Sequence, residues 1–299
     1  MTETPLHWGA EALWQQLRAL LPGLSVEVVE RCSSTNTALL ERARVVMRPE
    51  TDSAEVLVQR SVESAAFGRR AADVQPCLLV AEHQTGGRGR LGRGWQSMPG
   101  ASLTFSLSMP VERADWSGLS LAVGLALAEA LDPVQEAAAP RVGLKWPNDL
   151  WLRGDDRKLG GILIEVAPLP GPVERAGERW VVIGAGLNVT PAPDTDVEAG
   201  TFRTGYACLQ EFEPALTAPQ VLHRVARPLL QAVLAFESAG LDPLRSRYAA
   251  RDVLAGRTVQ AGAVTGVAIG LSHDGSLQVR DAQGAVHSLH SGEVSVRPC

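Results

Sequence analysis

Apolar and polar residues alternate along several short runs of the chain, and elsewhere apolar residues recur every three or four positions. Alternating or continuously apolar runs favour strands, and the longer spacing favours helices. The first kind of pattern predicts strands over residues 25–30, 77–83, 102–109, 143–146, 150–153, 160–167 and 179–189. The second predicts helices over residues 7–21, 34–44, 116–131, 218–238 and 242–250, with Pro228 bending the fourth of them.

The residues after Ala255 form a segment of a different kind. Short strand-like runs follow one another closely there, with His273–Gly275 as one tight turn, at 257–260, 263–271, 276–280, 286–290 and 293–297. Closely spaced strands of this length are typical of a small β-barrel. The whole pattern therefore predicts an α+β protein with a small β-barrel at the end.

The same pattern suggests three parts within the 299 residues. We expect a short helical segment over 1–25, a main domain over 26–252 and the barrel domain over 253–299. Residues 45–76 are interpreted as an insertion in the main domain, helical from Glu55 to Arg70.

Composition narrows the class of protein. With 45% hydrophobic and 20% charged residues the chain has ample material for a core, and a net charge of -5 argues against a protein that coats nucleic acid. The first ten residues lack the features of a signal peptide, and no apolar run reaches the roughly 20 residues of a membrane span. The four cysteines form no CxxC pair, which favours reduced thiols in a cytoplasm and no structural metal site.

Lysine and asparagine are almost absent from the chain. Its basic residues are nearly all arginine; lysine occurs only at positions 145 and 158, and asparagine only at 36, 148 and 188. All five residues fall within five short windows: 31–37, 82–97, 145–149, 157–165 and 184–189. A residue type that survives only in such windows indicates that its own chemistry is needed there, so we predict that the windows form one site.

The window at 86–95 is a loop of glycines and arginines. It contains the spacing GxGxxG of a dinucleotide site, but a strand follows it where that site requires a helix. Glycine lets the backbone fold over a ligand, and guanidinium groups bind phosphate or carboxylate oxygens. The loop is therefore either a solvated basic loop or a flap that carries Arg88, Arg90 and Arg93 to an anionic ligand.

Three further windows place polar groups at predicted strand or helix ends. The segment 145–149 (KWPND) combines an ammonium, an amide and a carboxylate at a strand end, where catalytic groups are common and where a simple turn is also possible. Lys158 begins the buried strand that continues through Gly160 and Gly161, and these glycines allow a ligand close to the backbone. The hydroxyl groups of Ser33–Thr35 suit a helix cap as well as a ligand.

In this order the motifs resemble those of the biotin protein ligases. The resemblance rests on Ser34–Asn36, the arginine loop with Trp95, KWPND at 145–149, KLGGILIE at 158–165 and Gly184–Asn188, and it extends from about Val26 to Arg297. It implies a catalytic domain of the class II synthetase type, with helices packed on a mixed β-sheet, and an SH3-like form for the small C-terminal β-barrel. It also implies an enzyme that activates biotin with MgATP to biotinyl-5′-adenylate. The biotinyl group would then pass to one lysine of a biotin carboxyl carrier protein.

The resemblance also implies roles for single residues. Biotin would be bound by Ser34, Thr35, Asn36, Gln84, Arg88, Gly89, Arg90, Lys158 and Gly161. ATP or the adenylate would be bound by Arg88, Arg90, Arg93, Trp95, Lys145, Asn148, Asn188 and Arg297. Cations must offset the repulsion between a carboxylate and an α-phosphate, which makes Lys158, Arg90 and Arg93 the catalytic candidates. Asp149 is the candidate to receive the proton of the carrier lysine or to orient its amine.

Some features depart from the family pattern. Only about 25 residues precede the first predicted strand, too few for the DNA-binding domain of the family's repressors, so we expect no DNA binding. Leu91 stands where some members have a further arginine. A lipoate-type ligase of the same fold is the alternative enzyme, and a biotin-responsive DNA-binding regulator is the alternative from another class. The sequence leaves open whether the protein is a monomer or a homodimer.

Overall fold

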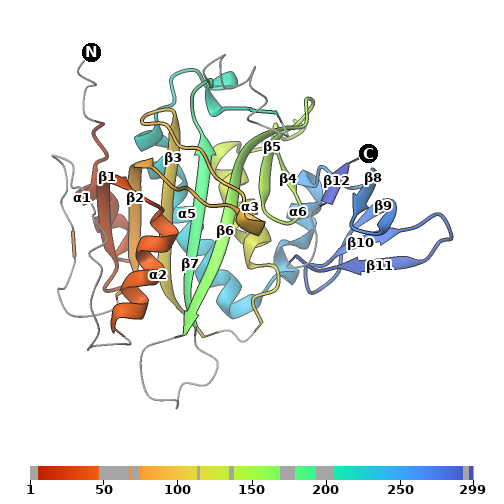
Figure 1. The fold of residues 1–299 in the computed structure, drawn as a ribbon, viewed down its shortest axis with the longest axis horizontal. Coiled ribbons are helices and arrows are strands. Elements are labelled where there is room, and N and C mark those ends of the chain that lie inside the picture. Colours follow the sequence, from red (N-terminus) through yellow and green to blue (C-terminus); the bar gives the residue numbers. More distant parts are fainter. Residues whose placement is uncertain are drawn as a thin grey trace.

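A seven-stranded mixed sheet with helices on both faces forms the body of the protein, and a smaller sheet lies beyond its β4 end (Figure 1). This computed structural model describes residues 6–46, 67–68, 75–112, 115–134, 138–168, 179–192, 205–291 and 296–298. Among them, no helix is long and apolar enough to cross a membrane.

The large sheet contains all the strands predicted before residue 190. Their order is β1-β2-β3-β7-β6-β5-β4; β1 and β2 are parallel, and every other neighbouring pair is antiparallel. Their bounds are β1 Ser25–Cys32, β2 Cys77–Gln84, β3 Ser102–Val111, β4 Val142–Lys145, β5 Asp149–Leu152, β6 Arg157–Pro168 and β7 Arg179–Asn188. The α+β class and the hairpin of β6 and β7 are confirmed.

The helices bury two separate hydrophobic clusters, one on each face of the sheet. On one face α2 (Thr35–Val46) packs Leu39 and Ala43 against Leu79 and Val182. The larger cluster fills the other face, where α1 (Ala10–Leu17), α3 (Leu119–Leu131) and α5 (Ala218–Ala239) lie. The short helix α6 (Arg245–Arg251) follows and contacts both β4 and the small sheet. The face that carries α2 also carries the functional site.

The small C-terminal sheet is antiparallel and contacts the main body through a turn. Its order is β11-β10-β9-β8-β12, with bounds β8 Thr258–Ala261, β9 Val264–Leu271, β10 Leu277–Arg280, β11 Val286–Leu289 and β12 Val296–Pro298. The indole Nε1 of Trp146 donates a hydrogen bond of 3.0 Å to the carbonyl of Gly275 in the turn before β10. This contact joins the KWPND segment to the small sheet.

Helix boundaries differ most from the sequence predictions. The first helix is confined to Ala10–Leu17 because Gly9, at φ 58°, lies outside the helical conformation. Helix α3 starts at Leu119 because Gly118 has φ 88°. The helix expected over 55–70 lies outside the described residues except at two positions, and there Phe67 forms an antiparallel bridge with Val26, so the helix prediction is wrong at that point.

Candidate functional site

The floor of the pocket is a row of small residues on the sheet face beside α2. Antiparallel pairing places Gly186 of β7 opposite Gly161 of β6, and Gly161 opposite Asp149 of β5. Side chains alternate across a strand, so these residues share one face. A Cβ at Gly186 would lie 2.4 Å from the Trp95 ring, and one at Gly161 would lie 3.1 Å from Lys158 Nζ. The glycines therefore create the space that pocket side chains and a ligand occupy.

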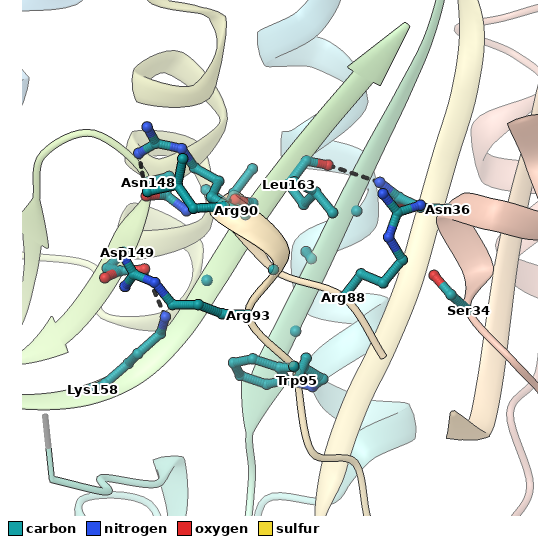
Figure 2. Close-up of a pocket in the computed structure, with 18 of the residues that line it drawn as sticks. Ser34, Asn36, Arg88, Arg90, Arg93, Trp95, Asn148, Asp149, Lys158 and Leu163 are labelled. Carbon is teal, nitrogen blue, oxygen red and sulfur yellow. Dashed lines mark hydrogen bonds and ion pairs between the residues drawn. The ribbon is translucent and has the colours of Figure 1, made fainter. Parts of the chain in front are cut away.

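The glycine- and arginine-rich loop crosses this floor and forms the roof (Figure 2). Its base is closed by backbone hydrogen bonds from Gly89 to Arg93 (2.7 Å) and from Trp95 to Gly87 (2.8 Å). A Cβ at Gly87 would lie only 2.3 Å from the carbonyl oxygen of Trp95, so this turn requires glycine. Leu91 at the tip has φ 56° and is 62% exposed.

Four cationic side chains line one end of the pocket around a single carboxylate. Lys158 Nζ lies 2.8 Å from Asp149 Oδ1, and Lys145 Nζ lies 4.0 Å from Asp149 Oδ2. Arg90 donates a 3.1 Å hydrogen bond to Asn148 Oδ1, and Arg93 lines the same end of the pocket (Figure 2). One carboxylate cannot balance four cations, so this end of the pocket attracts anions.

The pKa values of two of these cations are lowered, in part because positive charges lie close together. Burial lowers the pKa of Lys145, and the neighbouring Lys158, Arg93 and Arg90 lower it further, against the opposing effect of Asp149. Burial and Arg93 likewise lower the pKa of Arg90. Arg90 Nη2 and Trp95 Nε1 are buried donors without a hydrogen-bond partner among the described residues. A buried donor without a partner is costly, which fits a site that a ligand completes.

The other end of the pocket is a chain of neutral polar groups. Gln84 Oε1 accepts hydrogen bonds from the backbone N–H of Thr35 (2.7 Å) and from its hydroxyl group (3.2 Å). Ser106 Oγ lies 2.6 Å from both Thr35 Oγ1 and Asn36 Oδ1. Asn36 Nδ2 donates to the carbonyl of Leu163 at 3.1 Å, and Ser34 Oγ accepts from the N–H of Thr37 at 3.4 Å, as the predicted cap. Polar donors and acceptors fixed in this way suit an uncharged polar ligand group.

The structure brings together all but two of the sixteen predicted site residues. Those that line the pocket are Ser34, Thr35, Asn36, Gln84, Arg88, Gly89, Arg90, Arg93, Trp95, Lys145, Asn148, Asp149, Lys158 and Gly161. Asn188 does not line it; its amide donates to the carbonyls of Lys158 (3.2 Å) and Ala207 (2.9 Å) and holds β7 to the start of β6. Arg297 is exposed on β12, and its neighbour Val296 reaches the pocket instead.

Sequence reasoning missed some residues of the site. Phe105 and Val296 line the pocket, and Ser106 joins its polar chain. Ser106 lies opposite Gly184 in the pairing of β3 with β7, and a Cβ at Gly184 would lie 2.2 Å from Asn36 Oδ1. Ser106 carried no signal of its own in the sequence, because its proximity to Asn36 depends on the register of strands about 80 residues apart. Val296 lies within the segment of family resemblance, but no role was assigned to it.

A pocket with a cationic end and a neutral polar end under a basic loop suits a protein that binds a small molecule with an anionic and a neutral polar part. Two family models match the chain: the "Biotin/lipoate A/B protein ligase family" over residues 69–188 and the "Biotin protein ligase C terminal domain" over residues 256–297. The chain is also 32% identical to the biotin–[acetyl-CoA-carboxylase] ligase of Mycobacterium tuberculosis, over 96% of this chain and 91% of that one. The chain therefore belongs to the biotin protein ligase family.

Other relatives and a solved structure agree with this assignment. The bifunctional ligase/repressor BirA of Escherichia coli is 34% identical over 73% of this chain, and the match spans 65% of that relative's length. The biotin–[acetyl-CoA-carboxylase] ligase of Paracoccus denitrificans is 31% identical over 69% of this chain and 85% of its own. The fold resembles that of the Aquifex aeolicus biotin protein ligase solved with biotin and ATP, with a TM-score of 0.66 at 23% identity over 92% of this chain and 99% of that chain.

Proposed function

We propose that this pocket is where the chain, an ATP-dependent biotin–protein ligase, activates biotin and transfers it to protein. The observation that carries the proposal is the group of four cations around Asp149 beside a neutral polar end. A carboxylate and a triphosphate repel each other, and fixed positive charge stabilises the charge that develops as they react. Lipoate has no ureido ring to match the polar chain from Gln84 to Asn36, which favours biotin over the lipoate alternative.

The first step joins the two substrates. An oxygen of the biotin carboxylate attacks the α-phosphorus of MgATP, and pyrophosphate leaves with the electrons of the broken P–O bond. The ammonium of Lys158 lies near Gly161 and Asp149, where it would contact both anions, and Arg90 and Arg93 of the loop line the same end of the pocket. The Mg²⁺ ion enters as part of the nucleotide substrate.

Biotin would lie along the floor with its ureido ring at the neutral end. Ser34, Thr35 and Gln84 supply hydroxyl and amide groups there, Gly161 gives room for the ring system, and the backbone of Arg88, Gly89 and Arg90 closes over it. The amide of Asn36 is occupied by Leu163, Ser106 and Glu165, so Asn36 would shape this end rather than touch biotin. The nucleotide would lie toward Trp95, Lys145 and Asn148, and direct contacts from Asn188 and Arg297 have less support because both lie outside the pocket lining.

The second step transfers the biotinyl group to the carrier. The ammonium of the carrier lysine, with a pKa near ~10.4 in isolation, loses a proton, its amine attacks the acyl carbon of the adenylate, and AMP leaves. Asp149 lies in the pocket next to Lys158 and would receive that proton or orient the amine. The proposed partner is the biotin carboxyl carrier protein of an acetyl-CoA carboxylase. A cytoplasmic location, the absence of DNA binding and the domain limits at 25/26 and 252/253 stay predictions.

The function is tested with purified protein, MgATP, biotin and an apo carrier domain. We expect release of pyrophosphate that depends on biotin, and a mass increase of one biotinyl group on one lysine of the carrier. Competition between lipoate and biotin for adenylate formation separates the two ligase classes, and we expect biotin to prevail. Absence of pyrophosphate and an unmodified carrier would refute the proposal.

Arg93→Ala is expected to weaken ligand retention and leave stability unchanged. Arg93 is exposed on the loop and lines the cationic end of the pocket, so its loss removes a charge-assisted contact to the adenylate. Dissociation of labelled biotinyl-adenylate should accelerate by roughly tenfold, while the free energy of unfolding changes by less than about 0.5 kcal/mol, as for most surface substitutions. Unchanged affinities for ATP and the adenylate would count against this role.

A further inference from the structure

Glu165 of β6 lies outside the pocket lining and contacts two residues that belong to it. Its Oε1 lies 3.0 Å from Nη2 of Arg88, and its Oε2 accepts a 3.0 Å hydrogen bond from Nδ2 of Asn36. Its side chain is 21% exposed, against 50% for that of Arg88. One carboxylate therefore joins the base of the loop to the first turn of α2.

The position of Glu165 is fixed by Asn36, which is itself held by its neighbours. Asn36, which is 3% exposed, is held by the carbonyl of Leu163 and by Ser106 Oγ, and it packs over Gly184. The side-chain amide of Asn36 is therefore fixed independently of the loop. The carboxylate of Glu165 is therefore held in place by Asn36 and faces the more exposed side chain of Arg88.

Arg90 and Arg88 anchor the loop on two different sides, and these two anchors differ in what surrounds them. On the KWPND side, Arg90 donates to Asn148, and both residues line the pocket, where a nucleotide would compete for them. On the α2 side, Arg88 pairs with Glu165, which does not line the pocket. The second anchor can therefore persist while substrates enter, react and leave.

We propose that Glu165 is a positioning residue that holds Arg88, and with it the loop over residues 86–94, closed over the pocket before and during the reaction. The pair is charge-assisted, and its carboxylate is partly buried and preoriented, which favours it over an ordinary exposed ion pair. This inference rests on the proposed function for its effect on catalysis, but not for its effect on the loop. Glu165 touches neither reacting group, so it acts on retention of the adenylate rather than on the chemical step.

Glu165→Gln tests the proposal, because it removes the charge and keeps the shape. The loop carries three arginines, so trypsin cleavage within residues 88–93, followed by mass spectrometry, reports loop opening without any substrate. We expect loop cleavage and adenylate release to be about three- to tenfold faster than in the wild type, in line with the strength of such a pair. The rate of adenylate formation at saturating substrates should stay within about twofold, since only interactions specific to the transition state change it.

Controls separate this inference from the function. Glu129→Gln breaks the Glu129–Arg247 ion pair far from the loop and should leave loop cleavage unchanged. Should Glu165→Gln fail to fold, Arg88→Gln breaks the same pair from its exposed side and leaves Arg90 and Arg93 as cleavage sites. It should show the same acceleration of loop cleavage in the absence of substrates. Loop cleavage at the wild-type rate in the folded variant would overturn the proposed role of Glu165, even if the enzyme still biotinylates its carrier. A third outcome is that the loop of Glu165→Gln is cleaved faster than that of the wild type, while biotin and ATP slow cleavage in neither protein. This would support the role of Glu165 and refute the proposed function.

Discussion

Lys158→Arg should abolish most adenylate synthesis while the protein stays folded. We expect biotin-dependent exchange of pyrophosphate into ATP to fall roughly 100- to 1,000-fold, the usual loss when one charge-stabilising donor is removed from a site. The ammonium occupies a confined position, 2.8 Å from Asp149 Oδ1, 5.8 Å from the centre of the Trp95 ring and close to the bare backbone of Gly161. A planar guanidinium is larger and donates in a fixed fork, so it cannot present the same point charge there.

A matched exchange elsewhere in the chain controls for the substitution itself. Arg224→Lys replaces a cation that pairs with both oxygens of Glu213, at 2.6 and 2.7 Å, away from the pocket. Exchange activity of this variant should equal that of the wild type. An equally active Lys158→Arg enzyme would remove our assignment of Lys158 as the residue that contacts both anions.

Asp132→Ala should destabilise the fold more than any other substitution discussed above, by about 3–5 kcal/mol of unfolding free energy. Asp132 follows α3 and is 4% exposed. Its carboxylate accepts hydrogen bonds from the N–H groups of Arg141 (2.7 Å) and Val142 (3.0 Å) and from the guanidinium groups of Arg141 (3.1 Å) and Arg251 (3.3 Å). Removing it leaves Arg251, which is 2% exposed, without its carboxylate at the junction of α3, β4 and α6.

The pH dependence of stability offers a second check on Asp132. Burial raises the pKa of this carboxyl, but the hydrogen bonds from Val142, Arg141 and Arg251 together outweigh that effect and hold it below its ordinary value. Since the folded state has the lower pKa, the stabilisation is fully present above the unfolded pKa of about 3.9 and is lost as the pH falls through the folded value. The difference in stability between wild type and Asp132→Ala should therefore shrink in acid.

Glu129→Ala is the matched control for Asp132→Ala in chemical denaturation. Glu129 lies one turn earlier on α3 and also pairs with an arginine of α6, Arg247, but on the surface. Exposed pairs contribute about 0–1 kcal/mol, so this variant should unfold almost as the wild type does. Equal destabilisation by the two substitutions would contradict the distinction between the buried and the exposed pair.

The parts of the site that could be predicted from the sequence are those whose residues lie close together along the chain. Local motifs were sufficient for Lys158, the arginine loop and KWPND, because each carries its chemistry within a few residues of a strand end. Asn188 and Arg297, the two predicted site residues that do not line the pocket, are used differently in the fold. The amide of Asn188 is used to hold the backbone of Lys158, and on β12 it is Val296 rather than Arg297 that faces inward.

The polar chain behind the loop could not be found from sequence spacing. It joins residues from α2, β2, β3 and β6, and it exists because Ser106 lies opposite Gly184, which lies opposite Leu163. A shift of one residue in the pairing of β3 with β7 would turn Ser106 to the other face of the sheet. Glu165 was part of a recognised motif, yet its partner Arg88 comes from a loop 77 positions earlier and only the folded structure brings them together.

A crystal structure of the protein with biotinyl-5′-adenylate tests the central claim most directly. We expect the adenylate phosphate within hydrogen-bonding distance of Lys158 Nζ and of at least one of Arg90 and Arg93, with the ureido ring at Thr35 and Gln84. We also expect that the ion pair between Arg88 and Glu165 persists. An adenylate bound elsewhere, or one whose phosphate makes no contact with Lys158, would contradict the central claim.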